Sequence, residues 1–335
     1  MSLSGRLVLG FCLLTAVAAH ARALDRTVRS EVAHGFSGAV LVARGDKVLL
    51  DEGYGNGIAK STRFWIASSG KQFASAAILK CLENGWLTLD DPLSRFFPNA
   101  PADKRAITIR QLLSHTSGLD QTYASEGASG RDDAVARMFA HPLIDSPGAK
   151  FHYSNDNYQF AAAIVEVASG DNYQAFVTRE LFRPAGLHDT GFAGSPGAKA
   201  VVAGRDAMPA RLATASWGME GVYSTTKDLW LWYRALRSGK VLKPADAALL
   251  FTPAAPIQEG KTALGWFIGT TDKGAARIFI RGNEDWGPNS LLYAYPDSGP
   301  NSGIVIVVLT HAGDANGDLS WSRFIHTKLE KQLGL

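Results

Sequence analysis

Two short stretches of the chain carry side chains whose types and spacing suit chemistry on a carbonyl group. In the first, RFWIASSGKQFASAAILKCLENG, Lys71 follows Ser68 by three residues, where a helix is predicted to begin. Positions i and i+3 share one helix face, so the lysine can take the proton that makes a serine hydroxyl nucleophilic. A helix start also offers backbone N–H groups and the positive end of the helix dipole to an oxyanion. The spacing therefore suits acyl transfer, with Ser68 as the nucleophile and Lys71 as the base.

The same stretch has a purely structural interpretation. Ser69 and Gln72 match the S-x-x-Q capping box that begins many helices. An S-x-x-K tetrapeptide also occurs by chance in many proteins. Taken alone, this motif therefore favours a capped helix over a catalytic site.

The second stretch is GAKFHYSNDNYQF, which places Tyr153, Ser154 and Asn155 just before another predicted helix. A tyrosine hydroxyl can relay a proton, and an asparagine amide two residues later can hold a substrate amide. The alternative is a capped turn with a half-buried tyrosine, because Ser, Asn and Asp are common in such turns.

The elements that must position these residues follow a simple order along the chain. Strand-like segments at 39–43 and 47–51 form a predicted hairpin, and β-rich runs such as GIVIVVLT return near the C-terminus. Predicted helices fill the middle. This order predicts an α/β (α+β) fold, with an antiparallel sheet from about 24–65 and 225–335 and an inserted, mostly helical region over about 66–224. The sheet is expected to be flanked by terminal helices, with a catalytic cleft between the two parts.

The N-terminus has the three-part pattern of a secretory signal peptide. Arg6 is followed by an apolar run from Leu7 to Ala19 and by Ala21-Arg22-Ala23, which predicts cleavage after Ala23. The apolar run is shorter than the roughly 20 residues that a spanning helix needs. We therefore expect residues 1–23 to be removed, the protein to be secreted or periplasmic, and no stable membrane insertion to follow.

Charge and cysteine content narrow the possible partners. The formal charge of +3 falls to +1 when residues 1–23 are removed with Arg6 and Arg22. No basic block indicates nucleic-acid binding. Cys81 is then the one remaining cysteine, so no internal disulfide is expected and a buried apolar role is the default.

Several segments, in order, give the chain a family resemblance. It resembles the serine β-lactamase and penicillin-binding protein superfamily, and within it the class C β-lactamase-related branch that includes D-amino-acid peptidases and esterases. The similar segments are FSGAVLVARGDKVLLDEGYG, FWIASSGKQFASAAILKCLENGWLTLDDPLSRFFP, ITIRQLLSHTSGL, FHYSNDNYQFAAAIVE, ELFRPAGLHDTGF, GMEGVYSTTKDLWLWYRAL and ALGWFI. The resemblance implies that Ser68 is the nucleophile, that Lys71 is or tunes the base, and that Tyr153 is the proton relay or the base. It also implies that Asn155 holds the substrate and that the Ser68 backbone N–H is the first oxyanion donor. It implies no metal and no organic cofactor.

The chain departs from this family at the third motif, which is usually K-T-G or H-x-G on a strand lining the cleft. Aligning IRGNEDWGPNSLLYAYP with that region puts Arg281 in place of the Lys or His and Asn283 in place of the glycine. Arg281 is then expected to grip a substrate carboxylate in a bidentate manner. The second oxyanion N–H is expected from Glu284. Lys261-Thr262-Ala263 is a poorer match, because it lies one strand too early and lacks the glycine.

These observations predict an exported serine hydrolase that acylates Ser68 with an amide, ester or β-lactam from a small molecule or peptide. Two alternatives stay open: a carboxylesterase of the same fold, and a non-catalytic ligand-binding protein, because the third motif is altered. His115 is expected to fix a loop by hydrogen bonding. Glu220 and Tyr223 either line the cleft or belong to a structural turn.

Overall fold

The computed structural model describes residues 19–193, 218–284, 286–296, 302–315 and 319–335. Residues 1–18, which hold most of the predicted signal peptide, lie outside this part. A helix covers residues 19–32 and therefore runs through the predicted cleavage position after Ala23. Leu24 is fully buried against the body of the protein.

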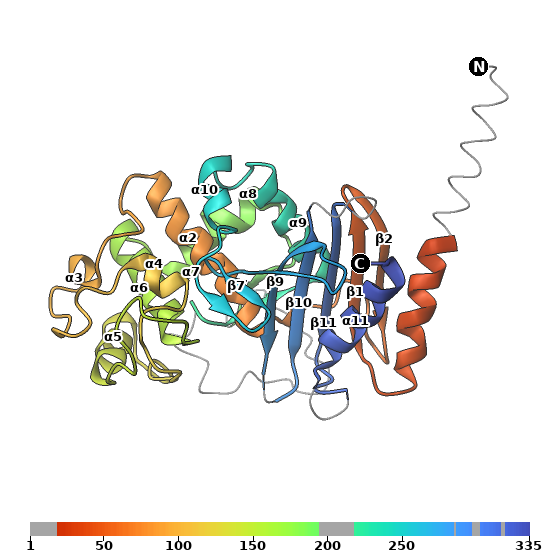
Figure 1. Ribbon diagram of the computed structural model, residues 1–335, viewed down its shortest axis with the longest axis horizontal. Helices are drawn as coiled ribbons and strands as arrows, with labels where there is room; N and C mark the ends of the chain where they lie inside the picture. Colours follow the sequence, from red (N-terminus) through yellow and green to blue (C-terminus); the bar gives the residue numbers. More distant parts are fainter. Residues whose placement is uncertain (1–18, 194–217, 285, 297–301, 316–318) are drawn as a thin grey trace, which may run out of the picture.

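An eight-stranded sheet joins the two ends of the chain, with strand order β2-β1-β11-β10-β9-β8-β7-β6. Strand β1 pairs antiparallel with β11, so the N-terminal hairpin completes a sheet made mostly from C-terminal strands (Figure 1). This confirms the predicted sheet from both termini. The strands are β1 (Gly38–Arg44), β2 (Lys47–Tyr54), β6 (Pro256–Ile257), β7 (Gly260–Thr262), β8 (Phe267–Thr270), β9 (Ala276–Asn283), β10 (Asn289–Tyr295) and β11 (Ile304–Thr310).

Apolar side chains cover both faces of the sheet. Successive residues of a strand point to opposite faces of the sheet. Val40 therefore packs with the terminal helices, 19–32 and α11 (Trp321–Leu333), whereas Leu41 belongs to the core cluster on the other face, which includes residues of the helices at 71–83 and 226–237. Strand β11 is buried on both faces. That explains its unbroken apolar sequence, which is typical of a strand covered on both sides.

The inserted region lies beside the sheet and is mostly helical (Figure 1). It begins with a 3₁₀ turn (Ala67–Gly70) and α2 (Lys71–Glu83), which packs against α6 (Asp156–Ser169). The other helices are α3 (Leu93–Phe96), α4 (Ile109–Leu113), α5 (Arg131–Ala140), α7 (Tyr173–Val177), a π-helical turn (Thr178–Phe182), α8 (Arg183–Ala185), α9 (Thr226–Arg237) and α10 (Pro244–Leu249). A small second sheet has the order β3-β5-β4, with β3 (Phe64–Trp65), β4 (Gly191–Phe192) and β5 (Val222–Ser224).

Helix α2 begins differently from the capping-box prediction, which is wrong. The Ser69 hydroxyl lies 2.8 Å from the Ser290 hydroxyl on β10, and Gln72 donates its side-chain amide to the Ser69 carbonyl at 2.7 Å. Ser69 therefore anchors the turn to the sheet instead of capping the helix. Since α2 is buried nearly all round, packing against the core stabilises it.

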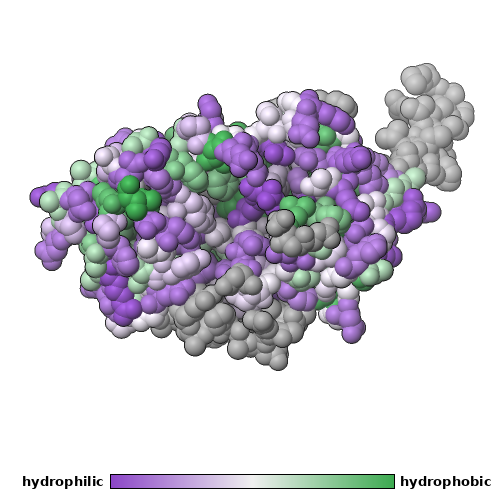
Figure 2. All heavy atoms as spheres, turned by 60° about the horizontal axis from the view of Figure 1, so that its bottom comes forward, coloured by the Kyte–Doolittle hydropathy of each residue, from purple (hydrophilic) through white to green (hydrophobic). Residues whose placement is uncertain are grey.

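The surface differs from this apolar interior. On the face shown in Figure 2, hydrophilic residues predominate and apolar residues form small, separate clusters. No helix in the described ranges is both long and apolar enough to cross a bilayer.

Candidate active site

The structure brings the two chemical stretches together around Ser68. The Ser68 Oγ lies 2.8 Å from Lys71 Nζ and 2.8 Å from the Tyr153 hydroxyl oxygen, although Tyr153 is 85 residues away in the chain. The first contact follows from helical spacing. The second depends on the packing of α6 against α2, which brings the start of α6 to the nucleophile turn.

Lys71 is oriented by two further acceptors. Its Nζ donates to Asn155 Oδ1 at 2.8 Å and to the Met219 carbonyl at 3.0 Å, and the side chain is only 3% exposed. Both partners accept and cannot donate, so they fix two of the amine hydrogens. The remaining position on Nζ faces Ser68 Oγ. The two atoms lie 2.8 Å apart, which is within reach of direct proton transfer.

Tyr153 is held from behind by His115. The two rings stack with centroids 4.4 Å apart, and His115 Nδ1 accepts the Ser154 backbone N–H at 3.2 Å. Burial, reinforced by the charge of Lys71, holds the pKa of His115 well below its usual range. The imidazole is therefore neutral and can accept this hydrogen bond, which confirms the predicted loop-fixing role of His115.

The residue before the nucleophile has an unusual backbone conformation. Ala67 has φ of 48°, in the left-handed region that non-glycine residues rarely adopt, and it is fully buried. Backbone strain of this kind costs about 1–3 kcal/mol and is concentrated at functional sites. The turn that presents Ser68 is therefore held in place by its surroundings.

The structure shifts the third motif by one residue. A Cβ added to Gly282 would lie 2.3 Å from the Ile66 carbonyl and 2.8 Å from the Ser68 backbone nitrogen. Gly282, not Asn283, therefore packs against the nucleophile turn. Alternation along β9 puts Ile280 on the same face as Gly282, so an apolar residue stands where the Lys or His was expected.

Arg281 points to the other face of β9. Its guanidinium lies over the Phe279 ring at 5.0 Å and forms an ion pair with Glu259 at 3.1 Å. Arg281 still lines the cleft next to Ser68. The predicted bidentate grip on a substrate carboxylate, however, must compete with Glu259.

The oxyanion prediction for Glu284 is also wrong. The Glu284 backbone N–H donates to the Pro288 carbonyl at 2.9 Å and is directed away from the cleft. Alternate N–H groups of a strand point to opposite edges, so the Asn283 N–H is directed toward the cleft instead. Asn283 lines the cleft with Ser68, Tyr153 and Asn155. Ser68 and Asn283 are therefore the candidate oxyanion donors.

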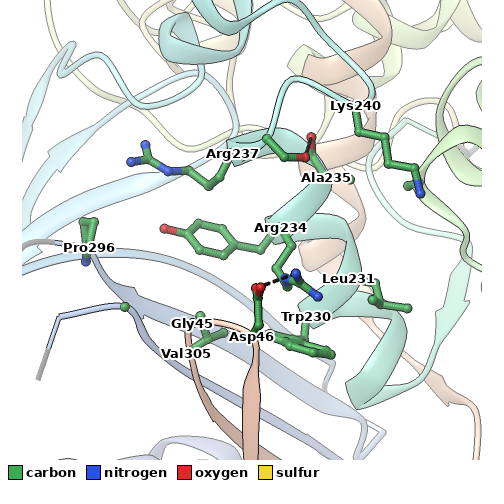
Figure 3. A pocket seen from close by; sticks show the side chains of 14 residues that line it. Gly45, Asp46, Trp230, Leu231, Arg234, Ala235, Arg237, Lys240, Pro296 and Val305 are labelled. Atoms are coloured by element: carbon green, nitrogen blue, oxygen red, sulfur yellow. Dashed lines mark hydrogen bonds and ion pairs between the residues drawn. The ribbon is translucent and has the colours of Figure 1, made fainter.

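Ser68, Tyr153 and Asn155 open onto a cleft of about 500 Å³, and Tyr123 at its wall is half exposed. A separate cavity of about 440 Å³ lies between α9 and the β1–β2 turn (Figure 3). None of the predicted catalytic residues lines it. Its Arg234 is paired with Asp46, and Arg234 and Arg237 complement the dipole at the end of α9. In the described part of the chain, no three His, Cys, Asp or Glu side chains are grouped to hold a metal ion.

The sequence profile of the beta-lactamase family matches residues 24–324. The chain belongs to the beta-lactamase family. It is 27% identical over 249 residues to PbpX of Bacillus subtilis (strain 168), which bears the name of a penicillin-binding protein. The match covers 70% of this chain and 62% of PbpX, so the chain spans less than two thirds of that relative.

Two solved structures share the fold of this chain. A penicillin-binding protein from Bacillus halodurans superposes with a TM-score of 0.72 at 23% identity, covering 92% of this chain and 99% of the other. The D-amino acid amidase from Ochrobactrum anthropi SV3, complexed with L-phenylalanine, gives 0.77 at 18% identity, covering 93% and 98%. Family membership supports a serine hydrolase type of function.

Three features of the site were missed in the sequence. They are the Met219 carbonyl that orients Lys71, the glycine at Gly282 that packs on the nucleophile turn, and Glu259, which neutralises Arg281. Each depends on a long-range contact. For Gly282 the sequence held one signal: alternate residues of a strand share a face, and that rule separates Gly282 from Arg281 and Asn283 on β9.

Proposed function

We propose that this beta-lactamase-family protein is a serine hydrolase that forms an acyl-enzyme on Ser68. The observation that carries the proposal is the position of Ser68 Oγ, 2.8 Å from both Lys71 Nζ and the Tyr153 hydroxyl. Hydrogen bonds to Asn155 and to the Met219 carbonyl orient Lys71 so that its Nζ is directed at Ser68 Oγ. The substrate is an amide, an ester or a β-lactam, and the names of the relatives support the amide and the β-lactam.

The proposed reaction has two balanced steps. Ser68 Oγ attacks the carbonyl carbon and its proton passes to Lys71, while the N–H groups of Ser68 and Asn283 stabilise the oxyanion. The carbon–nitrogen or carbon–oxygen bond then breaks, and the leaving group takes the proton, relayed by Tyr153. Water attacks the resulting ester, releases the acid and returns the proton to Ser68.

A second candidate is a ligand-binding protein without turnover. The observation that favours it is Ile280, which puts no charge on the face of β9 that meets Ser68. Such a protein binds a ligand in the cleft but forms no covalent adduct. A carboxylesterase of the same fold, in contrast, forms the adduct and differs only in preferring esters.

Intact-mass spectrometry of the protein from Leu24 onward tests the proposal. The protein is incubated with a fluorophosphonate and, separately, with a penicillin, and Ser68→Ala is the control. An adduct on the wild type but not on Ser68→Ala supports Ser68 as a reactive nucleophile. A long-lived adduct with penicillin indicates peptidase-like behaviour, and a short-lived one indicates β-lactamase-like behaviour. No adduct with either reagent favours the binding-only candidate.

We also propose export, with removal of residues 1–23. The support is the basic, apolar and small-residue pattern of the leader. N-terminal sequencing of the protein from fractionated cells should give Leu24 as the first residue in the secreted or periplasmic fraction. A cytoplasmic protein that starts at Met1 would contradict this.

A further inference from the structure

Two carboxyl groups stand together beside the catalytic cleft. Glu220 follows Met219, whose carbonyl contacts Lys71, and Glu284 follows Asn283, which lines the cleft. The two carboxyl groups lie within hydrogen-bonding reach of each other. We call Glu220 and Glu284 the acid pair. The sequence segments are 64 residues apart, so the tertiary fold alone brings them together.

One carboxyl oxygen of the acid pair lacks a hydrogen-bond donor within the described residues. Glu220 is only 5% exposed, and its Oε1 has no hydrogen-bond partner within the described structure. Glu284 Oε1 accepts from the Trp65 indole N–H at 3.1 Å. A buried acceptor without a donor costs about 1–3 kcal/mol. Binding of a ligand that donates an N–H group to this oxygen would therefore be favoured.

The charge of the acid pair identifies the kind of donor. Burial, and then the neighbouring Glu284 carboxylate, raise the pKa of Glu220 to about 9. At neutral pH Glu220 therefore holds a proton, because its surroundings favour added positive charge. The Lys71 ammonium is already directed at Ser68, Asn155 and Met219. The pair thus lacks a dedicated cation in the described structure.

Aromatic rings surround this carboxylate pair. Trp65 packs edge-on against Tyr223 at 5.2 Å and against Trp286 at 6.0 Å. Tyr123, half exposed at the cleft wall, is close enough that, after burial, the charges of Glu284 and Glu220 raise the pKa of its phenol. Carboxylates beside aromatic faces are the surroundings that proteins use to bind ammonium groups.

Charges of both signs line the cleft itself, where Arg281, Arg323 and Asp314 lie. Arg281 and Arg323 both contact the single carboxylate of Glu259. On β9, Arg281 precedes the candidate oxyanion donor Asn283, and Glu284 follows it. A carbonyl bound at Asn283 therefore lies close to Glu284.

We propose that the acid pair binds the free ammonium group of the substrate, so that the cleft takes amino-acid amides and short peptides with a free amino terminus. In such compounds the α-ammonium belongs to the acyl part, which is the part transferred to Ser68. This inference rests on the proposed function, since it names the substrate class of the same site.

The kinetic test compares alanine 4-nitroanilide, as both enantiomers, with the N-acetylated compounds. The wild type is expected to cleave the free amine faster. Glu284→Gln should lower kcat/KM for the free amine about tenfold more than kcat/KM for the acetylated substrate, because a charged hydrogen bond usually contributes about this factor. Glu52→Gln, an exposed change on the edge strand β2, is the matched control. Ser68-dependent cleavage with no preference for the free amine overturns the inference and leaves the proposed function intact.

A binding test separates the two proposals if no substrate is turned over. Phenylalaninamide and N-acetylphenylalaninamide are titrated calorimetrically into Ser68→Ala, with and without Glu284→Gln. Binding of the free amine that depends on Glu284 supports the ammonium site even though hydrolysis has failed. Equal binding of both compounds, or no binding of either, overturns it.

Discussion

Replacing Gly282 by alanine should disable the nucleophile without touching any group that reacts. The added Cβ would lie 2.3 Å from the Ile66 carbonyl and 2.8 Å from the backbone nitrogens of Ser68 and Ser69. Ordinary contacts of a Cβ begin at 3.4 Å. Since all three neighbours are backbone atoms, none can swing aside, and the turn or β9 must move by about 1 Å.

The size of the effect follows from that displacement. Moving a reacting group by 1 Å costs about a hundredfold in rate, and overpacking of this kind destabilises a fold by about 1–3 kcal/mol. We therefore expect Gly282→Ala to stay folded but to label about a hundredfold more slowly. The rate of Ser68 labelling by a fluorophosphonate, followed by intact mass, measures the first effect. Thermal unfolding measures the second.

Gly191→Ala is the matched control for this experiment. Gly191 lies on the short strand β4, and a Cβ placed there meets no atom within 4 Å. This variant should label and unfold like the wild type. If folded Gly282→Ala also labels at the wild-type rate, the close packing of Gly282 against the nucleophile turn is refuted.

Three further predictions concern single groups. Lys71→Met should abolish labelling, whereas Tyr153→Phe should slow it by about a hundred- to ten-thousandfold, the range for lost proton transfer; equal labelling rates in wild type and either variant would contradict the assigned roles. Burial raises the pKa of Asp156 to about 6. The protonated carboxyl therefore contributes fully to the free energy of unfolding below the pKa of Asp in the unfolded chain, and this contribution is lost as pH rises through 6. Asp156→Asn should therefore reduce the wild-type loss of stability between about pH 4 and pH 6, by up to roughly 3 kcal/mol, in denaturant melts. Cys81, whose thiol pKa burial raises to about 12, should resist iodoacetamide until the protein unfolds; alkylation of the native protein would contradict its burial.

Local patterns were enough to predict most of the fold and the first half of the site. Period-two runs and turn residues located β1, β2 and the C-terminal strands, and the order of elements predicted a sheet from both termini. Ser68 and Lys71 share a helix face by geometry alone. The one local prediction at this point that failed was the Ser69 capping box, because the Ser69 hydroxyl pairs with the Ser290 hydroxyl on β10 instead of a backbone N–H at the helix start.

Long-range contacts account for what the sequence could not predict. Whether Gly282 or Asn283 meets the nucleophile depends on the register of β9 against β10, and a shift of one residue exchanges the two faces of a strand. Likewise, the charge that Arg281 offers a ligand depends on Glu259, 22 residues away. The sequence by itself determined which residues can do chemistry, because side-chain type and helical spacing are local properties. Only the tertiary structure decided where their charges and hydrogen bonds are directed, because those depend on partners that packing brings from distant parts of the chain.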